Sequence, residues 1–337
     1  MSRHKFKDLY VPMLKLPWPM IEKTIRKLSA SDIFHFSLIS PEHLQCIRST
    51  TGHALSGAEI ELEVTSPEEM KIVFTTVDAN VTAFVISFKD IKKAAEYIMK
   101  NKNFNQEIDG FPMKMRLYKN KTTVYAPSGF ESKIALINYC FENLQCQGIS
   151  LRFESSKDQI SVYQPIVNAF DQCQDLRIWC DSETQSNDDM EEFLSGIQVS
   201  RRFHLHQRSV QLLRLPPSVF SANKLIIFPR IVLTRETLLS INCEYAAFHN
   251  TDLTSEDLSA FVVKWFNSDG TQFKRLKVGT KIPFEPLDLS SIPGQYIEPM
   301  DNDKTKISRA DGTFAVLVFP WPRIFDFRVS DEEVEFY

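Results

Sequence analysis

Apolar residues near the start of the chain recur at helical spacing in three short runs. Ile21, Ile25 and Leu28 lie at i, i+4 and i+7, which predicts one helix with a single apolar face. The segment Ser29–Asp32 has the spacing of a capping box, and Ser40-Pro41 supplies a cap oxygen followed by proline at the first helical position. The pattern therefore predicts three short helices in the first fifty residues.

The apolar residues of these helices exceed what a small three-helix bundle can bury. Helices shorter than about 12–15 residues are marginal in water, so they must pack on something. A surplus of contiguous apolar side chains is typical of a partner interface. The pattern alone leaves two alternatives open, a partner protein or the next part of the same chain.

From residue 58 to residue 145, polar and apolar residues alternate as they do in half-buried strands. The predicted strands are 59–64, 71–74, 81–88, 113–118 and 122–125, the last two forming a hairpin. One helix is predicted from Asp90 to Lys100, and a capping box at Ser128–Glu131 predicts the start of another. This region is expected to be a small, largely antiparallel sheet.

After residue 145 the pattern changes to short apolar strands separated by capped helices. The predicted strands are 149–153, 176–180, 199–205, 225–228, 245–249 and 274–278, with centres 21–29 residues apart. Ser186, Thr234 and Thr254 are the predicted N-caps of the helices between them. A strand and a helix at this period resemble leucine-rich repeats, with parallel strands joined by crossovers. Residues 279–305 are predicted to be irregular, and Asp311-Gly312 predicts a closing hairpin.

The predicted fold class is α+β or α/β, in three parts. These are a helical module at 1–50, a mainly antiparallel α+β segment at 58–145, and an irregular leucine-rich-repeat-like stack at 146–337 that ends in a β-hairpin.

The order of features near the N-terminus resembles the F-box, a three-helix module that opens with Leu-Pro. The matching positions within residues 14–48 are Leu16, Pro17, Ile21, Leu28, Asp32, Ile33, Leu38, Ser40 and Leu44. The chain departs from the common pattern at Trp18-Pro19 and at Pro41. The resemblance implies docking onto the Skp adaptor subunit of a Skp–cullin–F-box ubiquitin ligase. The implied Skp contacts are Leu16, Pro17, Ile21, Leu28, Ile33 and Leu38.

A second resemblance lies near the C-terminus. Residues 253–265, with Leu253, Thr254, Asp257, Leu258 and Trp265, are similar to a signature of the nematode-expanded type 2 F-box-associated domain. Residues 307–318 are similar to the hairpin that closes these proteins. Ser259 and Val262 replace the usual Asn and Leu. The resemblance implies a domain that binds a protein client.

Composition narrows the possible functions. The formal net charge is −4 with both signs interspersed, which does not predict binding to nucleic acid or to a membrane surface. The six cysteines form no C-x-x-C pair, and together with the lack of a secretory signal they favour a cytoplasmic or nuclear protein with reduced thiols. No phosphate loop, dinucleotide fingerprint or hydrolase motif occurs in the sequence, so no catalytic residues, cofactor or metal are predicted. We therefore expect a non-enzymatic protein.

Strand alternation selects candidate residues for client binding. They are Arg177, Arg201, His204, His206 and His249. His204 and His206 share one face of a predicted strand, and with no third ligand they are interpreted as a surface pair and not as a metal site. The leading hypothesis is a ligase adaptor that binds Skp, and through it a cullin, and presents a client. The alternatives are a non-catalytic interaction scaffold without ligase recruitment and a hydrolase or transferase with a dispersed site.

Overall fold

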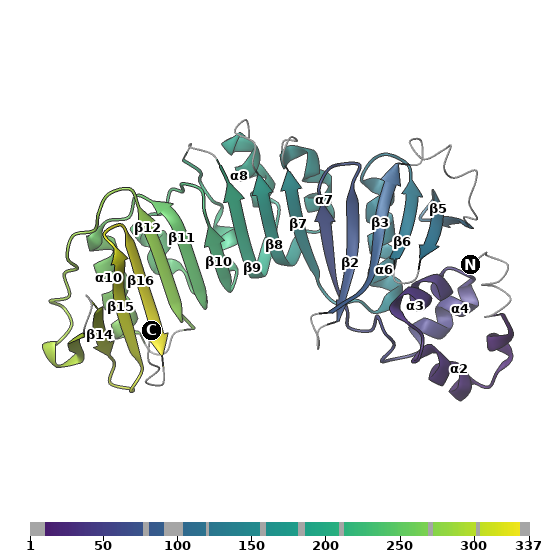
Figure 1. The fold of residues 1–337 in the computed structure, drawn as a ribbon, viewed down its shortest axis with the longest axis horizontal. Coiled ribbons are helices and arrows are strands. Elements are labelled where there is room, and N and C mark those ends of the chain that lie inside the picture. Colours follow the sequence, from purple (N-terminus) through teal and green to yellow (C-terminus); the bar gives the residue numbers. More distant parts are fainter. Residues whose placement is uncertain are drawn as a thin grey trace. The chain divides into compact units, whose positions relative to one another are not determined.

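The computed structural model describes residues 11–76, 81–90, 104–118, 121–155, 160–180, 186–208, 212–268, 272–300 and 304–330. The chain forms two compact units. The first holds Met1–Asp158 and Val162–Cys173, and the second holds Gln159–Ser161 and Gln174–Tyr337. Figure 1 colours the chain from its N-terminus to its C-terminus and labels most of the elements.

Among its described residues, the first unit contains four short N-terminal helical segments followed by a mixed sheet and two further helices. Its helical segments are η1 (Val11–Lys15), α2 (Trp18–Ile25), α3 (Ala30–Ser37), α4 (Pro41–Arg48), α6 (Glu131–Leu144) and α7 (Gln164–Ala169). Its strands are β1 (Glu59–Val64), β2 (Met70–Thr76), β3 (Val81–Asp90), β4 (Phe104–Ile108), β5 (Phe111–Tyr118), β6 (Lys121–Ala126) and β7 (Ile149–Ser155). They lie in the order β7-β1-β2-β3-β6-β5-β4, and only the β1/β7 and β3/β6 pairs among them are parallel.

The N-terminal helices contact the sheet and α6 of this unit through hydrogen bonds and aromatic packing. Nε2 of His35 on α3 lies 2.8 Å from the hydroxyl of Thr122 on β6, and the ring centroids of Phe34 and Phe84 are 5.4 Å apart. The hydroxyl of Tyr139 on α6 donates to Ser37 at 2.9 Å. Helices α3 and α4 therefore pack on the sheet and on α6, and the predicted boundary between 1–50 and 58–145 does not separate compact units.

The second unit continues the chain with parallel strands and ends in antiparallel ones. Its strands are β8 (Gln172–Cys180), β9 (Gln198–Gln207), β10 (Lys224–Ile227), β11 (Tyr245–Thr251), β12 (Arg275–Thr280), β13 (Ile297–Met300), β14 (Lys304–Ser308), β15 (Phe314–Trp321) and β16 (Ile324–Ser330). Its helical segments are α8 (Asn187–Ser195), η3 (Pro217–Ser221), α9 (Arg235–Ser240), α10 (Ser255–Asn267) and η4 (Gly294–Tyr296), and η2 (Ile160–Tyr163) spans the division between the units. The strand order is β8-β9-β10-β11-β12-β16-β15-β14-β13.

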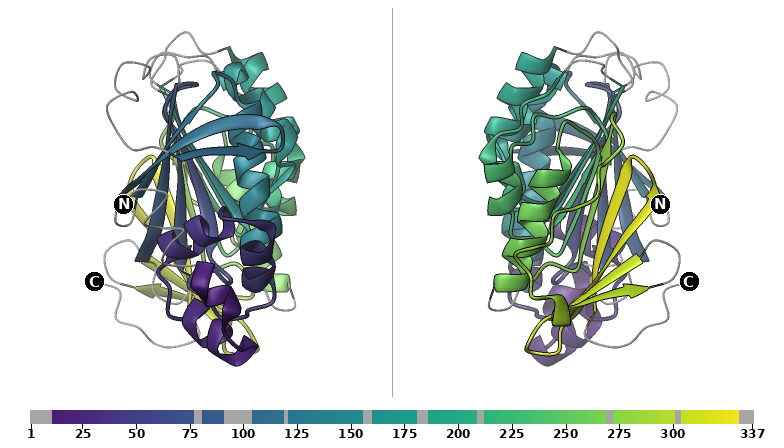
Figure 2. Two further views of the ribbon diagram at one scale, coloured as in Figure 1. Left: turned by 90° about the vertical axis from the view of Figure 1, so that its right-hand side faces the viewer. Right: turned by 90° about the vertical axis from the view of Figure 1, so that its left-hand side faces the viewer.

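Strands β9, β10, β11 and β12 are parallel, as the strand–helix rhythm predicts. Figure 2 shows the helices of this unit on one side of its strands. Side chains that point to that side are fully buried, and Phe327 of β16 packs against Phe261 and Trp265 of α10 at ring-centroid distances of 5.3 and 5.2 Å. The core of the second unit thus lies between the strands and α10.

Several local predictions differ from the structure. Ser128 does not cap α6, because the helix begins at Glu131 with Phe130 as N-cap and no side-chain cap. The sequence does not predict strands β4, β13 and β16, and β13 lies in the segment expected to be irregular. The helix predicted at Asp90–Lys100 falls almost entirely outside the described residues.

The glycine at position 279 is required by a close approach of two strands. A Cβ atom built on Gly279 of β12 would lie 2.7 Å from the carbonyl oxygen of His249 on β11. Real Cβ atoms do not come this close to backbone, so a side chain here would force the two strands apart.

Candidate partner-binding surfaces

The N-terminal helices expose a small apolar group at the start of α2. Leu16, Trp18 and Met20 are 38, 43 and 53% exposed, and Pro17 is exposed between them. Pro17 is the N-cap of α2, and Pro19 lies in its first turn, where a missing N–H group has no cost. We call Leu16, Pro17, Trp18 and Met20 the α2 apolar group.

The Skp contacts implied by the sequence divide into exposed and buried residues. Leu16 and Pro17 are exposed and Leu28 is half-buried, but Ile21, Ile33 and Leu38 are only 6, 0 and 5% exposed. The buried residues pack inside this chain and present almost no area to a partner in this conformation. Sequence reasoning did not select Trp18 and Met20 as adaptor contacts. The helical spacing puts Met20 on another side of α2 from Ile21 and Ile25, whereas Trp18 shares their side but is the first residue of the helix.

The second unit has a sheet face that no helix covers among its described residues. Along β10, along β12 and along β9 from Arg202 onward, the side chains of this face alternate with buried ones, whereas on β11 Ala247 of this face is buried as well. We call it the open face. It carries Arg177, Trp179, Arg202, His204, His206, Lys224, Ile226, Phe228, Tyr245, His249, Arg275, Lys277, Asp326 and Arg328.

Four of the five client-binding candidates lie on the open face. His204, His206 and His249 surround Phe228 with ring-centroid distances of 5.6, 5.2 and 4.2 Å, and the His249 and Phe228 rings are stacked at 6°. Arg177 lies on β8, where its guanidinium bonds to Asp175 at 3.2 Å. Phe228 lies in the predicted strand 225–228, but the sequence did not single it out, because the three histidines around it come from other strands.

The fifth candidate, Arg201, is held by a buried carboxylate. Its Nε donates to Asp175 at 2.8 Å, and Asp175 itself is only 3% exposed. The Arg201 guanidinium therefore forms an ion pair within the chain.

Burial keeps one of these histidines neutral. Desolvation lowers the pKa of His204 to about 4, with smaller contributions from His206, Arg177, Arg202 and His249. At neutral pH the ring is therefore an aromatic surface and not a cation. Among the described residues, no group of three or more His, Cys, Asp or Glu side chains has the arrangement of a metal site.

A separate cavity of about 580 Å³ lies where β11 and β12 end and α10 begins. Its lining mixes both charges, including Arg230, Lys281, Asp252 and Glu256. Arg230 bonds to both carboxylate oxygens of Asp252 at 2.8 and 2.9 Å. The cavity therefore has no single charge that would select an anion or a cation.

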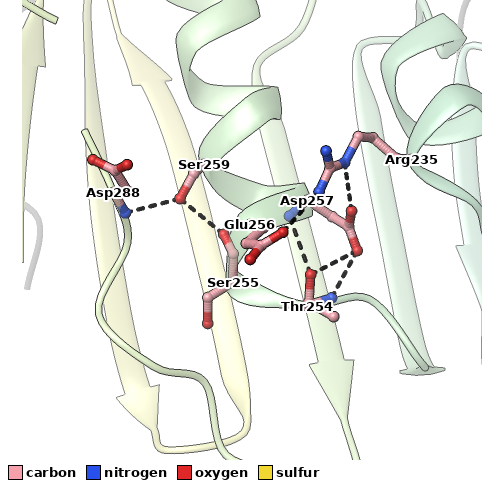
Figure 3. A network of polar contacts seen from close by, with 7 residues as sticks. All are labelled: Arg235, Thr254, Ser255, Glu256, Asp257, Ser259 and Asp288. Carbon is pink, nitrogen blue, oxygen red and sulfur yellow. Dashed lines mark hydrogen bonds and ion pairs between the residues drawn. The ribbon is translucent and has the colours of Figure 1, made fainter. Parts of the chain in front are cut away.

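The first turn of α10 beside this cavity supplies its own cap (Figure 3). Thr254 accepts from the Asp257 N–H at 3.3 Å, and Asp257 accepts from the Thr254 N–H at 2.9 Å. Arg235 of α9 donates to Asp257 at 2.7 Å. Although burial acts in the opposite direction, these hydrogen bonds hold the pKa of Asp257 below its usual value. The capping box predicted from the sequence is confirmed.

Replacing Thr254 by alanine is expected to lower the free energy of unfolding by about 1 kcal/mol, because both reciprocal cap bonds depend on this residue's conformation and hydroxyl. Urea denaturation of the full chain measures the change. Thr254→Ser retains the hydroxyl and is the matched control. Equal losses in the two variants would show that the hydroxyl does not stabilise the helix.

A family model described as F-box associated matches residues 217–278. This segment runs from the start of η3 into β12 and includes β10, α9, β11 and the capped helix α10. No family model detects an F-box at the N-terminus. No curated protein and no solved structure matches the chain significantly. No helix in the described part of the chain is long and apolar enough to cross a membrane. The match supports an F-box-associated domain over residues 217–278.

Proposed function

We propose that this chain is the substrate-recognition subunit of a Skp–cullin–F-box ubiquitin ligase. The N-terminal helices bind the Skp adaptor, which links the chain to a cullin, and the second unit binds a protein client. The observation that carries the proposal is the F-box-associated match over residues 217–278, in a chain whose N-terminal part has three short helices beginning after Leu16-Pro17. The proposed subunit is itself non-catalytic.

The α2 apolar group supports adaptor binding through its exposure. Burying one large apolar side chain contributes roughly 1.5–3 kcal/mol, whereas association costs about 4–15 kcal/mol in lost freedom. Several side chains must therefore act together, and Leu16, Trp18 and Met20 lie within five residues of one another. The buried Ile21, Ile33 and Leu38 act by holding the helices in place.

Replacing both Trp18 and Met20 by aspartate is expected to reduce recovery of a co-expressed Skp adaptor by at least about tenfold, because two charges would have to be desolvated at the interface. Both side chains are exposed, so the fold should be retained. Lys23→Ala on the same helix is the control and should bind as the wild type does. Full recovery by the aspartate variant would refute docking through this group.

A stand-alone interaction scaffold is the second candidate function. It is favoured by the packing of α3 and α4 on the chain's own sheet and α6, which accounts for much of their apolar surface without a partner. A folded wild-type chain that elutes alone from a sizing column after co-expression with the adaptor would favour the scaffold.

A further inference from the structure

Basic side chains form a row across the open face of the second unit. The strand registers pair Arg202 with Lys224, Lys224 with Tyr245, Tyr245 with Arg275, and Arg275 with Arg328. Side chains opposite one another on neighbouring strands are about 5 Å apart. Four cations and one tyrosine therefore lie side by side over five strands, although no two of them adjoin in the sequence.

The carboxylates near this row neutralise only part of its charge. Asp326 bonds to Arg275 and Arg328 at 2.8 and 2.7 Å. Asp175 bonds to Arg177 and Arg201, and Glu244 pairs with Lys274. Within the described residues, no ion pair joins Arg202, Lys224 or Lys277 to a carboxylate. A face with surplus positive charge thus occurs in a chain whose net charge is −4.

An aromatic row lies farther along the same strands. Trp179, His204, Phe228 and His249 follow one another with ring-centroid distances of 4.7, 5.6 and 4.2 Å. Nε2 of His204 is buried and makes no hydrogen bond among the described residues. The open face thus has a row of basic side chains and, farther along the strands, a row of aromatic rings in which Nε2 of His204 makes no hydrogen bond to a described residue.

We propose that the open face binds an extended acidic segment of the client protein. This inference rests on the proposed function and specifies the class of client. Carboxylates of the segment pair with Arg202, Lys224 and Lys277, and an apolar or aromatic side chain packs on Trp179 and Phe228. Five strands at a spacing of about 4.8 Å span roughly 19 Å, which an extended peptide covers with about six residues.

The aromatic row favours a peptide over single-stranded nucleic acid. Nucleic-acid platforms offer ring faces on which bases stack. Here the Phe228 and His249 rings stack on each other at 6°, which uses one face of each ring within the chain.

Fluorescence anisotropy with the full chain tests the proposal. The probe is a fluorescein-labelled peptide of alternating glutamate and tyrosine, compared with the same peptide carrying glutamine in place of glutamate. The acidic peptide is expected to bind at least about tenfold more tightly. Lys224→Glu and Lys277→Glu should each weaken it by about tenfold or more, because like charges across an interface repel. Lys281→Glu, the same charge change outside the open face, should leave binding unchanged.

Three results of the binding measurements would overturn the proposal. They are equal binding of the two peptides, an equal effect of Lys277→Glu and Lys281→Glu, and tighter binding of an oligouridine than of the acidic peptide. If the chain forms a dimer in solution and Lys277→Glu dissociates it, the occupant of the open face is a second copy of the chain. That result would also overturn the proposal. Adaptor recovery from the same preparations is independent of this face. A retained adaptor complex without peptide binding refutes only this inference, whereas peptide binding without the adaptor complex refutes the ligase role.

Discussion

Replacing Phe327 by alanine is expected to lower the free energy of unfolding of the second unit by about 3–5 kcal/mol. Phe327 is fully buried, and three aromatic rings, those of Phe261, Trp265 and Phe325, lie within 6.4 Å of its centroid. Its removal would leave a cavity between β16 and α10 that these rigid rings cannot close. The loss therefore includes both the transfer of the ring to water and the contacts its neighbours lose.

Hydrogen exchange of the α10 amides, followed by mass spectrometry of the full chain, measures the loss of stability at the helix that contacts Phe327. Ile282→Ala is the control, since Ile282 is 77% exposed and its truncation should change stability by less than about 0.5 kcal/mol. Unchanged protection of α10 in the Phe327 variant would mean that the helix does not depend on this contact.

Lowering the pH from 6.5 to 5 is expected to cost the chain about 2 kcal/mol of stability through His35 alone, at about 1.36 kcal/mol per pH unit. Burial lowers the pKa of His35 to about 3 in the folded chain, from 6.5 when it is exposed. Between these values the unfolded chain binds a proton that the folded chain excludes. The contribution of neutral His35 is therefore complete above pH 6.5 and falls as the pH decreases toward 3.

Urea denaturation at the two pH values tests this in the wild type and in His35→Gln, whose amide can still reach the Thr122 hydroxyl. The variant should lose about 2 kcal/mol less than the wild type over the same interval. It should retain some pH dependence, because burial also lowers the pKa of His53 and of His204 to about 4. If the free energy of unfolding changes with pH by the same amount in the variant and in the wild type, His35 binds protons equally in the folded and unfolded states.

The sequence predicts an element most accurately where the interactions that form it lie within one short segment, as in the N-cap of a helix. Ser186, Thr234 and Thr254 cap α8, α9 and α10 as their spacing predicts. Ser128 and Glu131 have the same spacing, yet the chain turns through Ser128-Gly129-Phe130 before α6 begins. Gly129 has φ +118° there, a conformation that no capping pattern reveals.

The remaining features depend on contacts between distant segments. Strand β4 (Phe104–Ile108) has a polar centre and forms only because β5 pairs with it. The sequence assigns Ile33 to a partner surface, but in the structure it is fully buried, on a helix that packs against both α4 and β3. The basic row is invisible in the sequence because strand register, and not chain order, brings Arg202, Lys224 and Arg275 together.

The short strand β13 has a consequence for the solubility of the protein. It ends the strand order of the second unit, it has only four residues, and one of them is Pro299, which has no N–H group to donate. Glu298 and Met300, on either side of Pro299, are exposed, so a charge also lies on this edge. A long sheet with a regular terminal strand would be a template for adding strands from other chains. At β13 the proline and the charge oppose that addition, and removal of Ile297–Met300 would expose the longer β14 to intermolecular pairing and aggregation.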